Sequence, residues 1–436
     1  MSVLRGIRVV EAASMVLVPA AAVMLADFGA EVIKVEPPEG DQNRYLHELP
    51  AMPDSEIPYS YMMDNRSKKG IVLDLKHPEG AAVLQRLVER ADVFMTNFRP
   101  PALARLGLRH EDLAPLNPRL VYASASGFGE AGPDAERPAY DTVVYWSRSG
   151  LESSVMTPDG RLGPIPAGSG DHPSALALFG AVVLALFARE RTGRGLKVST
   201  SLFAAGAWAN ATTIQAQLCG AKFHPKWTRE TAPSFGAVYY RTRDARFLKF
   251  SLVNPVKLWP RFCHAVGHPE LIDDPRFATL ESRHLHAQEL IGMFDRAFAR
   301  HDAGYWLEQL QTHDLPFAIL ATYPEVTSDP QATANSLFPA FDHPRFGRLQ
   351  TVDNPIRVAG VDKAALRAAP ELGQHTREIL ADVGYSPAEI TDLLARGIAV
   401  GGDPNAPIHN ESRNCDHPDP ASPEVKTTNR PPLDLV

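Results

Sequence analysis

Alternating apolar and polar segments in the first part of the chain predict an α/β fold. Residues 7–11 read as a buried strand, residues 20–28 as a helix that stops at Gly29, and residues 31–35 as a second strand. A strand, a helix and a second strand in this order form a βαβ unit, whose strands lie parallel. The pattern therefore predicts a parallel sheet that starts near the N-terminus.

The same alternation continues along the chain. Helices are predicted after most of the strands, at about residues 78–90, at residues 203–219 and in a long apolar segment from Ala175 to Phe187, and residues 39–63 are predicted to form a surface loop. Further strands are predicted at residues 71–75, 93–96, 120–124 and 197–200. These elements extend the sheet and assign residues 1–221 to the first part of a large domain. The loops that follow the strands lie at the edge of the sheet where such folds bind ligands.

The pattern changes near residue 222. Residues 222–338 combine a short hairpin with mainly helical segments, which predicts a second, smaller α+β domain. Residues 339–400 are predicted to return and complete the large domain. Residues 401–436 contain seven prolines and no aromatic residue, so a disordered tail is predicted there.

Composition narrows the class of protein. The 436 residues carry a net charge of −7, which does not suggest a nucleic-acid surface. No uninterrupted apolar run approaches the ~20 residues of a membrane span, and the N-terminus shows no signal-peptide pattern. Cys219, Cys263 and Cys415 are widely spaced, which argues against a zinc site or a disulfide framework. We therefore expect a cytoplasmic protein with no metal and no membrane partner.

One short stretch combines glycines with an acid just before the long apolar helix. Gly168 and Gly170 allow a ligand to approach the backbone, and Asp171 stands where a helix N-cap belongs, at what reads as a strand-to-helix corner. Asp171 can be read in two ways, as a simple capping residue or as a nucleophilic carboxylate. Local sequence leaves both interpretations open.

Motifs of several other enzyme classes are missing. The chain has no GxSxG for a serine hydrolase and no GxxxxGK[ST] phosphate loop. Glu36 ends the second strand as in nicotinamide-binding proteins, but the loop after the first strand lacks the glycine fingerprint. These absences leave the carboxylate of Asp171 as the candidate centre of chemistry.

Basic residues are spread over the predicted loops of the sheet. Lysine and arginine are usually solvated surface charges, but their shared placement suits an anionic ligand that carries phosphates. These residues are Arg66, Lys68, Lys69, Arg99 and Arg105. An acyl-CoA thioester fits both features, because a carboxylate can attack a thioester whose thiolate leaves readily. Backbone N–H groups near Gly168 and Gly170 could stabilise the oxyanion, and the helix N-terminus would keep Asp171 ionised.

Several motifs together resemble the family III CoA-transferases, which include formyl-CoA:oxalate and carnitine CoA-transferases. The resemblance extends from about Leu4 to Val400. The matching stretches are LRGIRVVEAAS, LADFGAEVIKVEPPEGD, NRSKKGIVLDLKHPEG, ADVFMTNFRPPALARLGL, LNPRLVYASASGFGEAGP, AYDTVVYWSRSG, GSGDHPSALALFGAVVLALFARERTGRG and GYSPAEITDLLARG.

The resemblance implies a fold, an assembly and a site. The fold would be a Rossmann-like large domain built from both ends of the chain plus a small domain, and the assembly a homodimer with interlocked subunits. CoA would be a substrate, and no permanently bound cofactor is implied. The catalytic aspartate falls on Asp171, next to Gly170, and Tyr140 matches a tyrosine near the site. The CoA-contacting positions fall on Met15, Val16, the loop after Glu36, Leu73, Asn97, Phe98 and Arg105, to which we add Lys68 and Arg99 as cations on neighbouring loops.

The predicted function is transfer of CoA from an acyl-CoA to a free carboxylic acid through a mixed anhydride and an aspartyl-CoA thioester. Alternatives are an acyl-CoA racemase or isomerase, an intramolecular CoA shift in a diacid, and a non-catalytic acyl-CoA-binding protein. Racemases of the family place a histidine where this chain has Tyr140, and a tyrosine is a poor base at neutral pH.

Two features concern the acid substrate. Residues 252–255 read LVNP where the formyl-CoA branch has a glycine-rich loop, which argues against oxalate or formate. Tyr140, Tyr145, Trp146 and Phe235 suggest a larger or less polar acid.

Overall fold

A seven-stranded sheet forms the centre of the structure, a computed structural model that describes residues 2–402. The strand order is β12-β3-β2-β1-β4-β5-β6, and every neighbouring pair is parallel except β12 with β3. The strands are β1 (Arg8–Ala12), β2 (Glu31–Glu36), β3 (Lys69–Leu73), β4 (Val93–Thr96), β5 (Val121–Ser126), β6 (Lys197–Ser201) and β12 (Ala399–Val400). The predicted α/β class with a mainly parallel sheet is confirmed.

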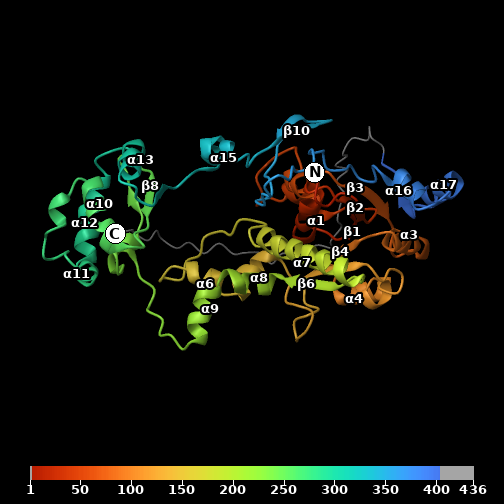
Figure 1. Cartoon of the computed structure of the whole chain (residues 1–436), viewed down its shortest axis with the longest axis horizontal. Helices are drawn as coiled ribbons and strands as arrows, with labels where there is room; N and C mark the ends of the chain where they lie inside the picture. The colour runs from red at the N-terminus through yellow and green to blue at the C-terminus, as the bar shows by residue number, and fades with distance from the viewer. Residues whose placement is uncertain (1, 403–436) are drawn as a thin grey trace, which may run out of the picture. The chain divides into compact units, whose positions relative to one another are not determined.

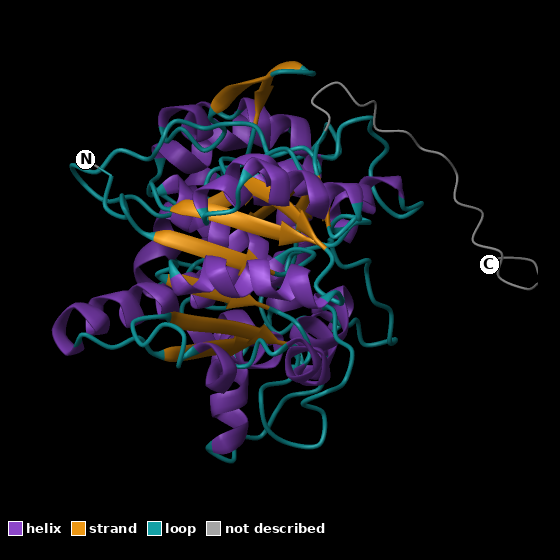
Figure 2. Cartoon of the chain, turned by 90° about the vertical axis from the view of Figure 1, so that its right-hand side faces the viewer, coloured by secondary structure: helices purple, strands orange, loops and turns teal. Residues whose placement is uncertain are grey.

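Each face of this sheet carries its own hydrophobic core. Val9 and its register neighbours Val32 and Val93 point into one core, whereas the next residue, Val10, points into the other. This alternation follows from the period of two in a strand. Helices therefore cover both faces, as Figure 2 shows around the central strands.

Different helices close the two cores. The first core is filled by α1 (Leu17–Asp27), α7 (Asp171–Thr192) and α8 (Leu202–Ala209). The second is filled by α3 (Pro78–Glu89), α16 (Thr376–Asp382) and α17 (Pro387–Ala395). Helix α1 packs along α7, and α7 also contacts β5 and β6 (Figure 1). The packing of α1 and α7 brings the loop after β1 close to Asp171.

A third core lies within residues 232–319 and involves no strand of the large sheet. Its antiparallel sheet consists of β7 (Tyr240–Arg241), β8 (Phe247–Phe250) and β9 (Phe317–Ile319), and confirms the predicted hairpin. The helices around it are α10 (Pro255–Ala265), α11 (Leu280–Leu285), α12 (Ala287–Phe298) and α13 (Ala303–Thr312). The domain boundaries at residues 222, 338 and 400 stay predictions.

Several local predictions need correction. The polar stretch 39–63 is not a plain loop, because it contains η1 (Gln42–Glu48) and most of α2 (Tyr59–Asn65). The helix predicted at residues 203–219 is two helices, α8 and α9 (Ala211–Leu218), separated at Asn210. No strand precedes Asp171, since described residues 156–170 form turns and irregular backbone, so the corner is loop-to-helix.

The remaining elements are short. They are α4 (Pro100–Leu106), α5 (His110–Leu113), η2 (Thr142–Arg148), α6 (Leu151–Val155), η3 (Arg229–Thr231), η4 (Phe235–Ala237), η5 (Pro269–Leu271), α14 (Tyr323–Ser328), α15 (Pro330–Ala334), β10 (Ala340–His343) and β11 (Gly347–Gln350). Of the predicted tail, only Gly401 and Gly402 fall within the described residues.

Helix α7 is unusual in length and composition. Within the described residues it is the one helix long and apolar enough to cross a membrane, although a core helix passes the same test. It buries Leu178, Val182 and Ala185 in the first core, whereas Leu184 and Phe187 on its other side are exposed. Its apolar character thus exceeds what the packing within one chain requires.

Candidate active site

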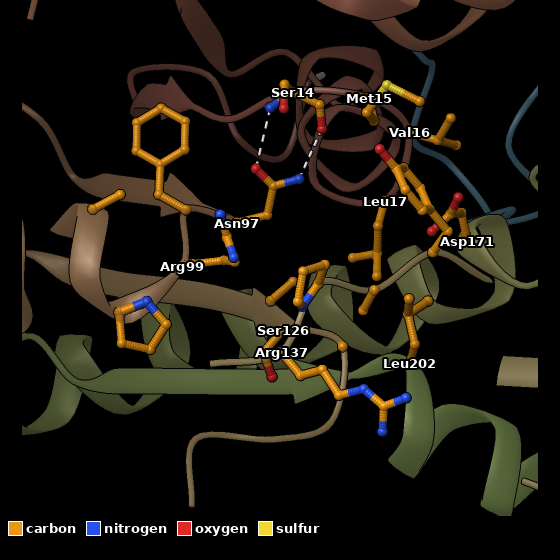
Figure 3. Close-up of a pocket in the computed structure, with 18 of the residues that line it drawn as sticks. Ser14, Met15, Val16, Leu17, Asn97, Arg99, Ser126, Arg137, Asp171 and Leu202 are labelled. Atoms are coloured by element: carbon orange, nitrogen blue, oxygen red, sulfur yellow. Dashed lines mark hydrogen bonds between the residues drawn. The ribbon is translucent and has the colours of Figure 1, made fainter. Parts of the chain in front are cut away.

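A cavity of about 430 Å³ opens at the carboxyl ends of β1, β4 and β5 and reaches the start of α7. This is the edge at which parallel sheets bind ligands. Seven residues predicted from the sequence line it, namely Met15, Val16, Asn97, Phe98, Arg99, Tyr140 and Asp171. Figure 3 shows Asp171 at one side of the cavity, near Val16 and Leu17, with Asn97 and Arg99 further along.

Four other predicted residues do not line this cavity. Leu73 is fully buried in β3, and Arg105 is exposed on the last turn of α4. Gly170 lies buried directly behind Asp171. Lys68 is buried and its ammonium donates to the Glu11 carboxylate at 2.6 Å.

The prediction of a cluster of basic loops is wrong for three of its five residues. Arg66, Lys68 and Lys69 lie at the amino end of β3, not at the carboxyl ends of the strands. Arg66 forms two hydrogen bonds with Asp27, and Lys69 contacts Glu31 at 2.9 Å. Their charges are therefore used within the fold, and Arg99 is the one of the five that lines the cavity.

Asp171 is the first residue of α7, and Gly170 takes the N-cap position. No side-chain capping bond is made at this helix start, so the interpretation of Asp171 as a capping residue is not supported by its contacts. Its carboxylate faces the cavity with Val16, Leu17 and Leu202 among the lining residues (Figure 3). The group is thus half-buried and available to a ligand.

The charges around Asp171 correct the expectation that the helix N-terminus keeps this residue ionised. Burial and the neighbouring Asp141 carboxylate raise the pKa of Asp171 to about 7, and His172 opposes them. Asp141 stands at the head of η2 and accepts from the Gly170 N–H at 3.0 Å and the Thr142 N–H at 2.8 Å. The helix N-terminus alone therefore does not keep Asp171 fully ionised at neutral pH.

The glycines before Asp171 have separate structural roles. Gly168 has a φ of +73°, a left-handed conformation that favours glycine. A Cβ on Gly170 would stand 2.6 Å from Cγ of Tyr145, so the ring occupies the space of a side chain. The predicted use of the Gly170 N–H as an oxyanion donor is not supported, because that N–H donates to Asp141.

The loop after β1 carries the other half of the site. Met15 has a φ of +67°, and its N–H donates to Asp41 while its carbonyl accepts from Asn43. Ser14 is bonded to Asn97 through both its N–H and its carbonyl, as Figure 3 shows. Three side chains from other elements thus hold a strained loop against the cavity.

Buried charges lie behind this loop. Lys34 contacts Glu11 at 2.9 Å and Asp41 at 2.7 Å, and all three side chains are almost fully buried. Glu36 is also buried and receives two hydrogen bonds from Arg44. Glu36 is therefore not free for a nicotinamide ribose, in agreement with the missing glycine fingerprint.

The four aromatic residues proposed for the substrate site are dispersed. Tyr140 lines the cavity. Tyr145 is buried against Gly170, and Trp146 donates to Ser169. Phe235 lies in the third core, among the rings of other buried aromatic residues. Of the four residues that suggested a larger or less polar acid, Tyr140 therefore lines the cavity, whereas Phe235 does not.

Sequence reasoning missed several residues of the site. Arg137 and Ser126 line the cavity, and Asp141, Asp64 and His172 surround the carboxylate of Asp171. Two of these follow predicted residues directly, since Asp141 comes after Tyr140 and His172 after Asp171. Asp64 gave no local signal, because its contact with His172 spans more than a hundred residues of the chain.

The chain is similar to known proteins over most of its length. The model of CoA-transferase family III matches residues 4–376. The (R)-2-hydroxy-4-methylpentanoate CoA-transferase of Clostridioides difficile is 31% identical over 395 residues, covering 89% of this chain and 98% of that protein. The cinnamoyl-CoA:phenyllactate CoA-transferase of Clostridium sporogenes is 31% identical over 392 residues, covering 89% and 95%. A solved CAIB/BAIF family protein from Brucella suis superposes with a TM-score of 0.76 at 29% identity, covering 88% of this chain and 99% of that one.

Proposed function

The chain belongs to CoA-transferase family III and is a CoA-transferase, and we propose that Asp171 carries first the acyl group and then CoA during the exchange. The observation that supports this role is the position of its carboxylate. Asp171 lines the cavity at the carboxyl edge of the sheet. The side chain makes no capping bond that would tie it to its own helix.

The proposed reaction has four steps that balance. The Asp171 carboxylate oxygen attacks the thioester carbon, the C–S bond breaks, and CoA leaves as a thiolate, giving a mixed anhydride. The thiolate then attacks the Asp171 carbonyl carbon, which releases the donor acid and leaves an aspartyl-CoA thioester. The acceptor carboxylate attacks that thioester to form a second anhydride and free thiolate. The thiolate finally attacks the acceptor's acyl carbon and restores the Asp171 carboxylate.

The cavity offers groups suited to CoA. Arg99 and Arg137 bring two guanidinium groups, which pair well with phosphates. Ser14, Met15 and Asn97 form one side of the cavity, and hydrogen bonds to one another and to Asp41 hold them in place. We therefore place the phosphates towards the two arginines and the thioester beside Asp171, with the pantetheine along the loop after β1.

We further propose that the acid substrate is a 2-hydroxy acid with a branched or aromatic side chain. Both relatives named above act on acids of this kind by name. The lining near Asp171 includes Leu17 and Leu202, which suit an apolar side chain (Figure 3).

The assembly is proposed to be a homodimer with interlocked subunits. Leu184 and Phe187 on α7, Trp208 on α8 and Leu218 on α9 are all more than half exposed in the single chain. Such large apolar side chains are usually covered by a partner. The large domain is proposed to be Rossmann-like, since its strands β3-β2-β1-β4-β5-β6 follow the doubly wound order.

A matrix of donors and acids tests the proposed function. Acetyl-CoA and cinnamoyl-CoA are each incubated with phenyllactate, 2-hydroxy-4-methylpentanoate, glutarate or oxalate, and new CoA esters are detected by mass spectrometry. The wild type should form hydroxyacyl-CoA, and Asp171→Ala should form none. Exchange by the Ala variant at the wild-type rate would contradict the role of Asp171. Exchange with glutarate or oxalate alone would contradict the substrate class.

A further inference from the structure

The histidine beside the nucleophile is held by both of its ring nitrogens. Nδ1 of His172 lies 2.9 Å from the Gly168 carbonyl oxygen, and Nε2 lies 3.1 Å from Oδ1 of Asp64. Asp64 belongs to α2 and its side chain is almost fully buried. The contact therefore joins the start of α7 to an element more than a hundred residues away.

These contacts determine the charge of the ring. A carbonyl oxygen can only accept, so Nδ1 of His172 must carry a proton. In a neutral ring Nε2 would then be an acceptor facing the carboxylate of Asp64, which also accepts. A doubly protonated ring satisfies both contacts. Burial opposes this charge, but the Asp64 carboxylate outweighs it and raises the pKa of His172 to about 9.

The other charges near Asp171 are anionic or already paired. Asp141 and Asp64 both disfavour ionisation of Asp171. Among the elements packed on α7, the charged residues are Asp27 of α1 and Lys197 of β6, which pair with Arg66 and Glu130. Arg99 and Arg137 line the cavity, where they would pair with the phosphates of the substrate. His172 is the cation that the described fold places directly beside Asp171.

We propose that His172, held by Asp64, is a positioning residue whose fixed positive charge favours the ionised form of the Asp171 carboxylate. The inference rests on the proposed function of Asp171 as nucleophile. The same ring also supports the loop before the helix, because its Nδ1–H donates to Gly168, which has a left-handed backbone. One side chain thus fixes both the charge and the shape of the segment that presents the nucleophile.

The first variant separates charge from shape. His172→Gln removes the positive charge but keeps an amide that can donate to Gly168. A matched control is His268→Gln, which breaks another histidine–carboxylate contact, with Glu270, outside this site. The kcat/KM of exchange is measured against pH with the fastest pair from the donor–acid matrix, since this profile reports the free enzyme.

Loss of the cation should raise the pKa of Asp171. The acidic limb of the profile should therefore move to higher pH by roughly one unit in His172→Gln and stay in place in His268→Gln. A loss of activity that is equal at every pH, with no displacement of the limb, would overturn the proposal. An absence of exchange in the wild type would instead overturn the proposed function.

A second readout needs no turnover. Full-length protein with ¹⁵N-labelled histidine is titrated by NMR, and His172 is identified by the signal missing from the His172→Gln variant. Both ring nitrogens should be protonated at pH 7.5 in the wild type, and Asp64→Asn should bring the transition down to near pH 6.5. A neutral His172 ring at pH 7.5 in the wild type would overturn the proposal.

Discussion

Two loops meet at the cavity, residues 13–16 after β1 and residues 168–172 at the start of α7, and both depend on buried acids. Each contains a residue in the left-handed conformation, Met15 in the first and Gly168 in the second. In the first loop the supporting acids are balanced, since Lys34 contacts both Glu11 and Asp41. The second loop is unbalanced, because three carboxylates share the single cation described beside them, His172.

The two loops therefore use buried charges in different ways, one to hold backbone in place and one to set the pKa of a carboxylate. The balanced network holds backbone in place: Lys34 and Lys68 keep the pKa of Glu11 low, while burial and Lys34 lower the pKa of Lys68 to about 8. In the unbalanced cluster, burial and the excess of carboxylates raise the pKa of one member, Asp171, to about 7. We therefore expect changes in the first loop to affect stability and binding, and changes in the second to affect the pH dependence of exchange.

The largest effect is expected from the balanced network. Glu11→Gln removes the anion that contacts both Lys34 and Lys68, which leaves buried ammonium groups undercompensated. The free energy of unfolding should fall by about 3–5 kcal/mol. Urea unfolding measures this change. The control Glu31→Gln affects a half-exposed pair and should cost less than about 1 kcal/mol.

The same variant should change the response to acid. Burial tends to raise the pKa of Glu11, but Lys34 and Lys68 outweigh it and lower that pKa. A lowered pKa contributes stability above the unfolded-state value, and this contribution is lost as the pH falls. Wild-type stability should therefore decline more steeply than that of Glu11→Gln below about pH 4.5. Equal slopes would contradict an ionised Glu11.

A smaller loss is expected at the second loop. Gly170→Ala places a Cβ where the Tyr145 ring lies, so the segment that presents Asp171 must shift. The cost should be about 1–3 kcal/mol of unfolding free energy, with a fall in exchange rate. Gly180 is the control, because it lies in the same helix and a Cβ there meets nothing within 4 Å. If both alanine variants behave alike, packing against Tyr145 does not position the site.

How much of this architecture the sequence predicts depends on the distance between the residues involved. Local patterns were sufficient for β1, β2, β4 and α3, because hydrophobic periodicity is set by neighbours along the chain. They failed for Lys68, whose basic character suggested a ligand contact although the fold pairs it with Glu11. Its contact crosses 57 residues and leaves no trace in local composition.

The candidate site shows the same limit. Asp171 was found because glycines and an apolar helix flank it, and Met15 and Asn97 came from the family resemblance. The pKa of Asp171 could not be anticipated, because it depends on Asp141 and Asp64, which only the fold brings near. Sequence therefore identified Asp171 as the candidate but misjudged its ionisation.

Because carboxylates outnumber cations around Asp171, Asp141→Asn should move the acidic limb of the pH profile in the direction opposite to His172→Gln. Asp141→Asn removes one anion yet keeps an oxygen to accept from the Gly170 N–H. The pKa of Asp171 should fall, and the acidic limb of kcat/KM should move to lower pH by roughly one unit. The exposed Asp342 gives the control Asp342→Asn. A limb that moves in the same direction in Asp141→Asn and in His172→Gln would refute the electrostatic account.

The smallest effect concerns the backbone of the first loop. Met15→Gly suits the left-handed conformation and should alter the free energy of unfolding by less than about 1 kcal/mol. Met15→Val, with a β-branched side chain, should lose about 1–3 kcal/mol. Urea unfolding of both variants decides the matter. Equal stability of the two would mean that Met15 is not strained.

Reductive trapping tests the role of Asp171 most directly. Wild-type enzyme is mixed with an acyl-CoA donor that is active in the matrix and treated with borohydride, which reduces an aspartyl thioester to the alcohol and releases CoA. Peptide mass spectrometry then reads residue 171. We predict homoserine at position 171, dependent on the donor and unaffected in the Glu31→Gln control. An unmodified Asp171 in an enzyme that exchanges CoA, or homoserine at another carboxylate, would contradict the account.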